Sequence, residues 1–136
     1  MSKGRILLLS GGVGGSKLAD GLAQALPPEQ LTIAVNTGDD FTHLGLRICP
    51  DIDTVSYMMG DLVDESKGWG RRAETWRCLE TIGELGGPDW FRLGDQDLAL
   101  HLVRTELLRQ GRHLSDVTAE LTARMGIKHQ VVPMTE

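Results

Sequence analysis

Cysteine is scarce in this sequence: only Cys49 and Cys78 occur among the 136 residues. Two cysteines cannot build a disulfide framework or a four-thiolate zinc site. No run approaches the roughly 20 apolar residues that a membrane helix needs. The apolar run near the N-terminus lacks the small-residue cleavage site of a signal peptide. These absences predict a reduced, cytoplasmic protein that does not engage a membrane.

Positive charge is also in short supply. There are 14 Lys and Arg residues against 19 Asp and Glu residues, which gives a formal net charge of -5. This balance argues against general nucleic-acid binding, although backbone amides can still hold an anionic ligand. The length and the 40% hydrophobic content indicate one globular domain over residues 1–136. Glycine is the one residue in excess, with 17 copies.

Two short apolar runs with a helical pattern between them predict a βαβ unit with parallel strands. Residues 5–10 are expected to form a strand buried on both faces, and residues 31–35 a second strand. The intervening helix should follow Gly15 and end at Pro27-Pro28. Beyond them we expect a loop over 41–52, helices from about 54, over 72–85, 95–110 and 115–126, and a third strand over 130–132.

The predicted fold class is α/β: a three-layer, Rossmann-like, mostly parallel sheet flanked by helices. Only three strands are convincing, whereas a sheet usually holds about five. The sequence stops just after the third strand. We therefore favour the truncated N-terminal part of a larger protein over a small fragment that folds alone.

A glycine-rich segment, Ser10 to Lys17, lies between the first strand and the first helix. Its glycines are Gly11, Gly12, Gly14 and Gly15. Glycines at a strand-to-helix turn let backbone amides approach a phosphate, and the helix dipole adds positive potential. Both common phosphate motifs fail here, one at Lys17 and the other at Ser16 and Leu18. We predict donor phosphate binding by these glycines and Lys17; the alternative is a tight turn without a ligand.

Acidic residues follow at two further places. The segment Asn36-Thr37-Gly38-Asp39-Asp40 comes after the second strand, where open α/β sheets bind ligands. It forms either a nucleotide rim or a simple Asx-turn. Asp51 and Asp53 stand two apart at a predicted helix start. In extended chain both would point to one side and could share Mg²⁺; otherwise one of them caps the helix.

The remaining candidates are aromatic or basic. Trp69 and Trp90 lie in turn-like surroundings, where a ring can stack on a planar ligand or cover the core. Arg92 is a fixed cation suited to a phosphate or a ring carbonyl. His101 and Arg104 share a helix face; a buried, satisfied histidine and a surface ion pair are the plain alternatives for these two.

Taken in order, these pieces resemble a known family. They include residues 11–18, Val35 to Asp40, Cys49 to Thr54, Gly68-Trp69-Gly70, Trp90 to Asp95, His101 to Thr105 and Pro133-Met134-Thr135. The set is similar to 2-phospho-L-lactate transferase of the CofD/FbiA type, from biosynthesis of the deazaflavin coenzyme F(420). The resemblance covers essentially the whole chain and corresponds to the N-terminal part of the family protein.

The resemblance implies an Mg²⁺-dependent transferase. It moves a 2-phospholactyl or phosphoenolpyruvyl group from a guanosine-diphosphate-linked donor to a hydroxyl of the deazaflavin FO and releases GMP. By the same resemblance Asp53, the catalytic candidate, and Arg92 contact FO, and the glycine segment faces the donor phosphates. Lysine is frequent in the family at the position of Arg92, and threonine is common at that of Val13. Asp51 and Asp53 are our candidates for the metal ligands.

The resemblance leaves some points open. The alternative function is a non-catalytic nucleotide- or nucleotide-sugar-binding regulatory module of the related fold. A phosphoryl-type transfer needs donor and acceptor held together with water excluded, and we expect this 136-residue chain to be an inactive fragment. A homodimer is among the assemblies compatible with the family.

Overall fold

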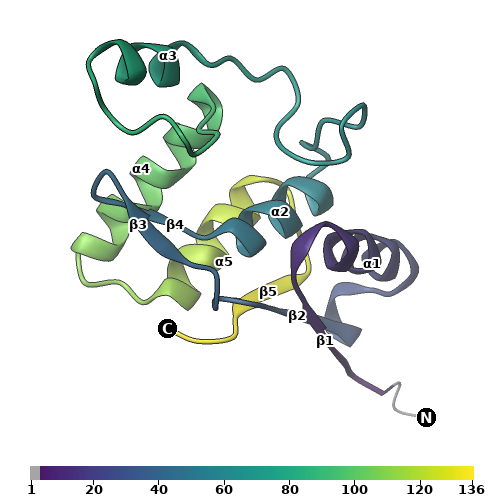
Figure 1. Cartoon of the computed structure of the whole chain (residues 1–136). Coiled ribbons are helices and arrows are strands. Elements are labelled where there is room, and N and C mark those ends of the chain that lie inside the picture. The colour runs from purple at the N-terminus through teal and green to yellow at the C-terminus, as the bar shows by residue number, and fades with distance from the viewer. Residues whose placement is uncertain (1–3) are drawn as a thin grey trace.

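The computed structural model describes residues 4–136 and has an α/β fold (Figure 1). Its strands are β1 (Ile6–Ser10), β2 (Leu31–Val35), β3 (Phe41–His43), β4 (Leu46–Ile48) and β5 (Gln130–Pro133). Its helices are α1 (Gly12–Ala25), α2 (Pro50–Met59), α3 (Arg77–Glu84), α4 (Asp95–Arg109) and α5 (Leu114–Arg124), with a 3-10 turn at Pro28–Gln30.

The main sheet has three parallel strands in the order β1-β2-β5. Leu8 of β1 pairs in register with Ile33 of β2, which in turn pairs with Val131 of β5. The carboxyl ends of all three strands therefore meet at one edge of the sheet. The predicted βαβ unit, the third strand and the α/β class with helices beside a parallel sheet are confirmed.

The core covers one face of this sheet. Leu31, Ile33 and Val35 of β2 and Val131 of β5 are at most 1% exposed, and they pack with apolar residues of α1, α2 and α5. Apolar burial of this extent is the main favourable contribution to folding.

The other face of β1 differs from the prediction. Leu7 and Leu9 are 62% and 67% exposed, so burial of this strand on both faces was wrong for the described chain. The reason is topological: β1 is an edge strand, and none of the described helices packs over this face of it. Alternation places Leu8 toward the core and its two neighbours away from it.

The loop predicted over 41–52 was also wrong. Residues 41–48 form an antiparallel hairpin, β3–β4, whose turn residues Leu44 and Gly45 have φ of 50° and 77°. Helix α2 then begins at Pro50, because proline has no amide hydrogen to lose at a first helical position and its φ is already helical. Pro50, which was placed in the predicted loop, is therefore the first residue of a helix.

The chain between α2 and α4 arches across the upper part of Figure 1 and is mostly irregular. Within it α3 starts at Arg77, five residues later than predicted. Within residues 4–136, no helix is both long and apolar enough to cross a membrane.

Candidate functional site

Helix α2 lies between α1 and α4 (Figure 1), and its first turn contacts both. On one side it meets the N-terminus of α1, and on the other it meets α4. We call the first region the glycine turn (residues 10–17). The second is the aromatic pocket, a cavity of about 380 Å³ between α2, α4 and the irregular chain that joins these two helices.

At the glycine turn the helix begins earlier than predicted. Gly11 is the residue before α1, and Gly12 is already its first residue, with φ of 66°. The Gly12 N–H donates to Asp51 Oδ1 at 2.6 Å. A carboxylate here satisfies one of the free amides of the helix end and interacts favourably with the helix dipole.

Two of the glycines are also needed for packing. A Cβ on Gly15 would lie 2.8 Å from Ser10 Oγ, and one on Gly11 would lie 3.2 Å from Asp51 Oδ1. These positions bring α1 against β1 and α2. By contrast, Gly14 has open space where its Cβ would be. Gly14 and Lys17 are both exposed at this end of the sheet.

The segment predicted as a nucleotide rim, residues 36–40, lies beside the glycine turn. Asn36 Nδ2 donates to Asp39 Oδ2 and to Asp51 Oδ2, at 3.2 Å each, and Gly38 N–H donates to Asn36 Oδ1. The last contact is an Asx-turn, as the plain alternative predicted. The structure thus brings Asn36, Asp39 and Asp51 together next to the amides of α1, and Thr37 Oγ1 contacts Thr135 Oγ1.

Asp40 is placed differently. Its Oδ2 lies 3.4 Å from Arg47 Nη2 on the hairpin, and its buried Oδ1 has no hydrogen-bond partner among residues 4–136. Burial raises the pKa of Asp40, and Cys49 and Arg47 only partly oppose this rise. Asp40 therefore belongs to the hairpin side of the rim and not to the Asn36 cluster.

Asp51 and Asp53 do not point to one side. They lie in the first turn of a helix, where a two-residue spacing separates side chains by about 200°. Asp51 faces the glycine turn, whereas Asp53 faces α4. The shared cation site predicted for an extended segment is not formed by this geometry.

The aromatic pocket contains both residues predicted to contact FO, Asp53 and Arg92. Tyr57, Trp69, Trp76, Trp90 and Phe91 supply its rings. Trp90 packs edge-on to His43, and Phe91 packs edge-on to Phe41, with ring centroids 5.3 Å apart in each pair. The β3–β4 hairpin thereby anchors this wall.

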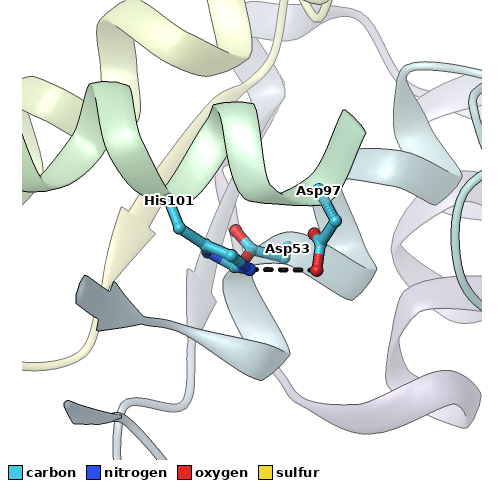
Figure 2. A group of neighbouring side chains, drawn as sticks. All are labelled: Asp53, Asp97 and His101. Atoms are coloured by element: carbon cyan, nitrogen blue, oxygen red, sulfur yellow. Dashed lines mark hydrogen bonds and ion pairs between the residues drawn. The ribbon is translucent and has the colours of Figure 1, made fainter. Parts of the chain in front are cut away.

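The inner wall of the pocket is a buried polar network. Arg104, 2% exposed, donates through Nη1 to Asp53 Oδ2 at 3.3 Å and through Nη2 to Asp53 Oδ1. His101 and Asp97, one turn apart on α4, point toward Asp53 (Figure 2). A buried guanidinium needs such a partner, because an unpaired charge in the interior is very costly.

His101 makes hydrogen bonds through both ring nitrogens. Arg104 Nη1 lies 3.3 Å from its Nδ1, and a guanidinium can only donate, so Nδ1 accepts. The proton then sits on Nε2 and is donated to Asp97 Oδ2 at 2.9 Å. Asp97 also accepts a hydrogen bond from the Tyr57 hydroxyl at 2.5 Å. His101 Nδ1 also lies 3.6 Å from Asp53 Oδ2, so the ring lies between the two carboxylates.

The two carboxylates of the network have opposite pKa shifts. Burial raises the pKa of Asp53, although Arg104 acts against the rise. Burial acts in the same direction on Asp97, but hydrogen bonds from His101 and Tyr57 outweigh it and lower the pKa of Asp97. Burial also raises the pKa of Tyr57, so this phenol stays protonated as a donor.

Asp53, Asp97 and His101 offer ligand atoms that all lie within 4.8 Å of one another. Arg104 already engages both oxygens of Asp53, and its positive charge opposes a second cation there. We therefore do not assign a metal to this cluster.

The Leu93-Gly94-Asp95 segment helps to cap the N-termini of α3 and α4. Asp95 accepts the backbone N–H groups of Arg77 and Cys78 at the start of α3, and Glu74 accepts those of Gln96 and Asp97 at the start of α4. A Cβ on Gly94 would overlap the Glu74 carboxylate. The two helix starts are therefore capped reciprocally, which fixes the pocket wall below Arg92.

Some members of this site were missed or misjudged from the sequence. Arg104 is a buried partner of Asp53 and not the surface ion pair considered above. Its spacing from His101 was visible, but nothing in the sequence pairs it with a residue 51 positions away. Tyr57, Trp76 and Asp97 carried no distinguishing local pattern.

The chain matches a known family over almost its whole length. Residues 6–136 match the family model of 2-phospho-L-lactate transferase CofD. The chain is 46% identical to a phosphoenolpyruvate transferase of Streptomyces griseus, over 97% of this chain and 42% of that protein. For a phosphoenolpyruvate transferase of Nocardia farcinica the identity is 47%, over 97% and 40% of the two chains.

An archaeal relative gives the same result. The chain is 42% identical to a 2-phospho-L-lactate transferase of Methanosarcina acetivorans, over 96% of this chain and 43% of that protein. The chain thus spans about two fifths of the length of these curated relatives. With the family model matched over residues 6–136, the chain belongs to the CofD family of 2-phospho-L-lactate transferases.

Proposed function

We propose that this chain carries the FO-binding pocket and part of the donor site of a transferase in coenzyme F(420) biosynthesis. The reaction moves a 2-phospholactyl or phosphoenolpyruvyl group from a guanosine-diphosphate-linked donor to FO and releases GMP. One observation carries the proposal: Asp53 and Arg92, far apart in sequence, line one aromatic pocket.

The pocket suits a planar, partly polar ring system. Rings on several sides offer stacking surfaces, and Arg92 lies 4.2 Å from the Trp76 ring centroid, where it can donate toward a ring carbonyl. Asp53 sits at the inner wall and is 5% exposed. A hydroxyl of FO that reached this wall would meet a carboxylate held in place by Arg104.

The donor belongs, in this proposal, at the glycine turn. The exposed start of α1 offers amides and a positive dipole end to phosphate oxygens. Asp39 and Asp51 converge on Asn36 beside these amides. Carboxylate oxygens next to phosphates fit Mg²⁺, so we assign the metal to Asp51 with Asp39. Bound there, Mg²⁺ would offset phosphate charge. Asp53, which pairs with Arg104, is assigned to FO.

The first turn of α2 then connects the two halves of the chemistry. A new bond forms between the FO hydroxyl oxygen and the phosphorus that carries the three-carbon acid, and the bond from that phosphorus to the GMP oxygen breaks. The hydroxyl proton passes to the Asp53 carboxylate, whose pKa is raised by burial and thus better matched to a base. The rest of the protein's task is to position both groups.

Binding of FO to the Arg92→Gln variant tests this proposal. Loss of a charge-assisted contact costs about 1.5–3 kcal/mol, which is roughly a ten- to hundredfold weaker affinity. The measurement is a titration of the chain with FO followed by tryptophan fluorescence, since three tryptophans line the pocket. Arg109→Gln is the matched control, because Arg109 is exposed and lies outside the pocket lining.

Two results would contradict the proposal. Equal FO affinity for the Arg92→Gln and Arg109→Gln variants would remove Arg92 from the site. Binding of GDP without any binding of FO would favour the nucleotide-binding regulatory module instead.

A further inference from the structure

The aromatic pocket contains two guanidinium groups that pair with none of its carboxylates. Arg71 and Arg92 both line the pocket. Within residues 4–136, neither guanidinium forms an ion pair or a side-chain hydrogen bond. Each instead lies against a ring: Arg71 is 5.6 Å from the Tyr57 centroid, and Arg92 is 4.2 Å from that of Trp76.

The acidic groups of the pocket are already engaged. Asp53 is held by Arg104, and Asp97 accepts from His101 and Tyr57. Glu74 accepts the first amides of α4. The carboxylates that line the cavity are therefore occupied, and the two arginines are available to an anion. Arg92 has a proposed partner in FO, whereas Arg71 has none.

Arg71 is held in a defined position. Its backbone forms a bridge with Val63, and the neighbouring Arg72 N–H donates to Leu62 O at 2.8 Å. The side chain is half-buried against Tyr57, whose hydroxyl is itself fixed by Asp97. A guanidinium restrained in this way loses little further freedom on binding, and its planar fork matches a carboxylate.

We propose that Arg71 binds the carboxylate of the three-carbon acid that is transferred. This inference rests on the proposed function. The relatives are named for phosphoenolpyruvate and for 2-phospho-L-lactate, and both groups carry a carboxylate bonded directly to the phosphate-bearing carbon. One cation can therefore serve both. In this proposal the phosphorus that is attacked lies beside Asp53, and the carboxylate of the same three-carbon group turns toward Arg71, which lines the same pocket.

The test is a set of calorimetric titrations with phosphoenolpyruvate, pyruvate and inorganic phosphate. Pyruvate has the carboxylate without the phosphate, and inorganic phosphate has the reverse. We expect Arg71→Gln to lower the affinity for phosphoenolpyruvate and for pyruvate about ten- to hundredfold, as for a lost charged hydrogen bond. The affinity for inorganic phosphate should not change. Arg71→Lys keeps the positive charge but loses the planar guanidinium, so its affinity for pyruvate should lie between those of the unaltered chain and Arg71→Gln. Arg109→Gln should match the unaltered chain.

Other patterns would overturn the inference. If Arg71→Gln lowers the affinity for inorganic phosphate and leaves the affinity for pyruvate unchanged, Arg71 binds a phosphate instead. No response of the unaltered chain to phosphoenolpyruvate, or equal affinities for all variants, would also reject it. An FO titration of the unaltered chain and of Arg92→Gln separates this failure from that of the proposed function: weaker FO binding by Arg92→Gln, together with equal pyruvate affinities of the unaltered chain and Arg71→Gln, rejects this inference alone. Circular dichroism establishes that each variant is folded.

Discussion

Asp51 and Asp53 are two residues apart and serve different regions. Asp51 accepts the Gly12 amide and the Asn36 side chain, whereas Asp53 is enclosed by Arg104 and α4. The sequence singled out both carboxylates, but it gave the wrong geometry because the helix was expected to start at about Thr54. A start at Pro50 turns the two side chains away from each other.

Asp97→Asn should destabilise the chain at neutral pH and have less effect in acid. The folded-state pKa of Asp97 is lowered, since hydrogen bonds from His101 and Tyr57 outweigh the effect of burial. Its stabilisation is therefore complete above the unfolded pKa of about 3.9 and is lost as pH falls through the lower folded value. We expect a loss of about 1–3 kcal/mol at pH 7, as for a disrupted buried hydrogen-bonded group.

Urea unfolding of both chains at pH 7 and at about pH 3 measures this difference. Glu106→Gln is a control, because Glu106 is exposed and its side-chain contacts with Arg109 and Gln110 lie at the surface. A difference that stays constant between the two pH values would show that Asp97 is not ionised in the network.

Helix α1 illustrates what an element's first residue requires. Gly12 has φ of 66°, a conformation that costs a residue with a side chain about 1–2 kcal/mol. Gly14 is already inside the helix, is exposed and has free space around its Cβ position. The sequence showed a cluster of glycines but could not rank them, because the helix start was placed after Gly15.

Gly12→Ala and Gly14→Ala should therefore change stability in opposite directions. We expect Gly12→Ala to lower the free energy of unfolding by about 1–2 kcal/mol through backbone strain. Gly14→Ala should raise it by about 0.5–1 kcal/mol, because alanine restricts the unfolded chain and favours a helix. Thermal unfolding of both variants is the measurement. Equal shifts would mean that α1 does not begin at Gly12.

At the scale of the whole molecule, the sequence predicted the parallel strands and the order of the main helices well. Regular apolar runs such as residues 31–35 specify their own structure, since their burial follows from a local pattern. The hairpin at 41–48 and the pocket were not predictable in this way. They depend on contacts between distant residues, such as His43 with Trp90 and Asp53 with Arg104.

The central claim is that the first turn of α2 separates a ring-binding pocket from a phosphate-binding turn. Amide and indole NMR spectra of the labelled chain, recorded with FO and separately with GDP and Mg²⁺, test this directly. We predict that FO shifts the indole signals of Trp69, Trp76 and Trp90 and leaves the amides of Gly12 and Gly14 in place. GDP with Mg²⁺ should do the reverse. Shifts of the glycine amides by FO, with unchanged indole signals, would contradict the account.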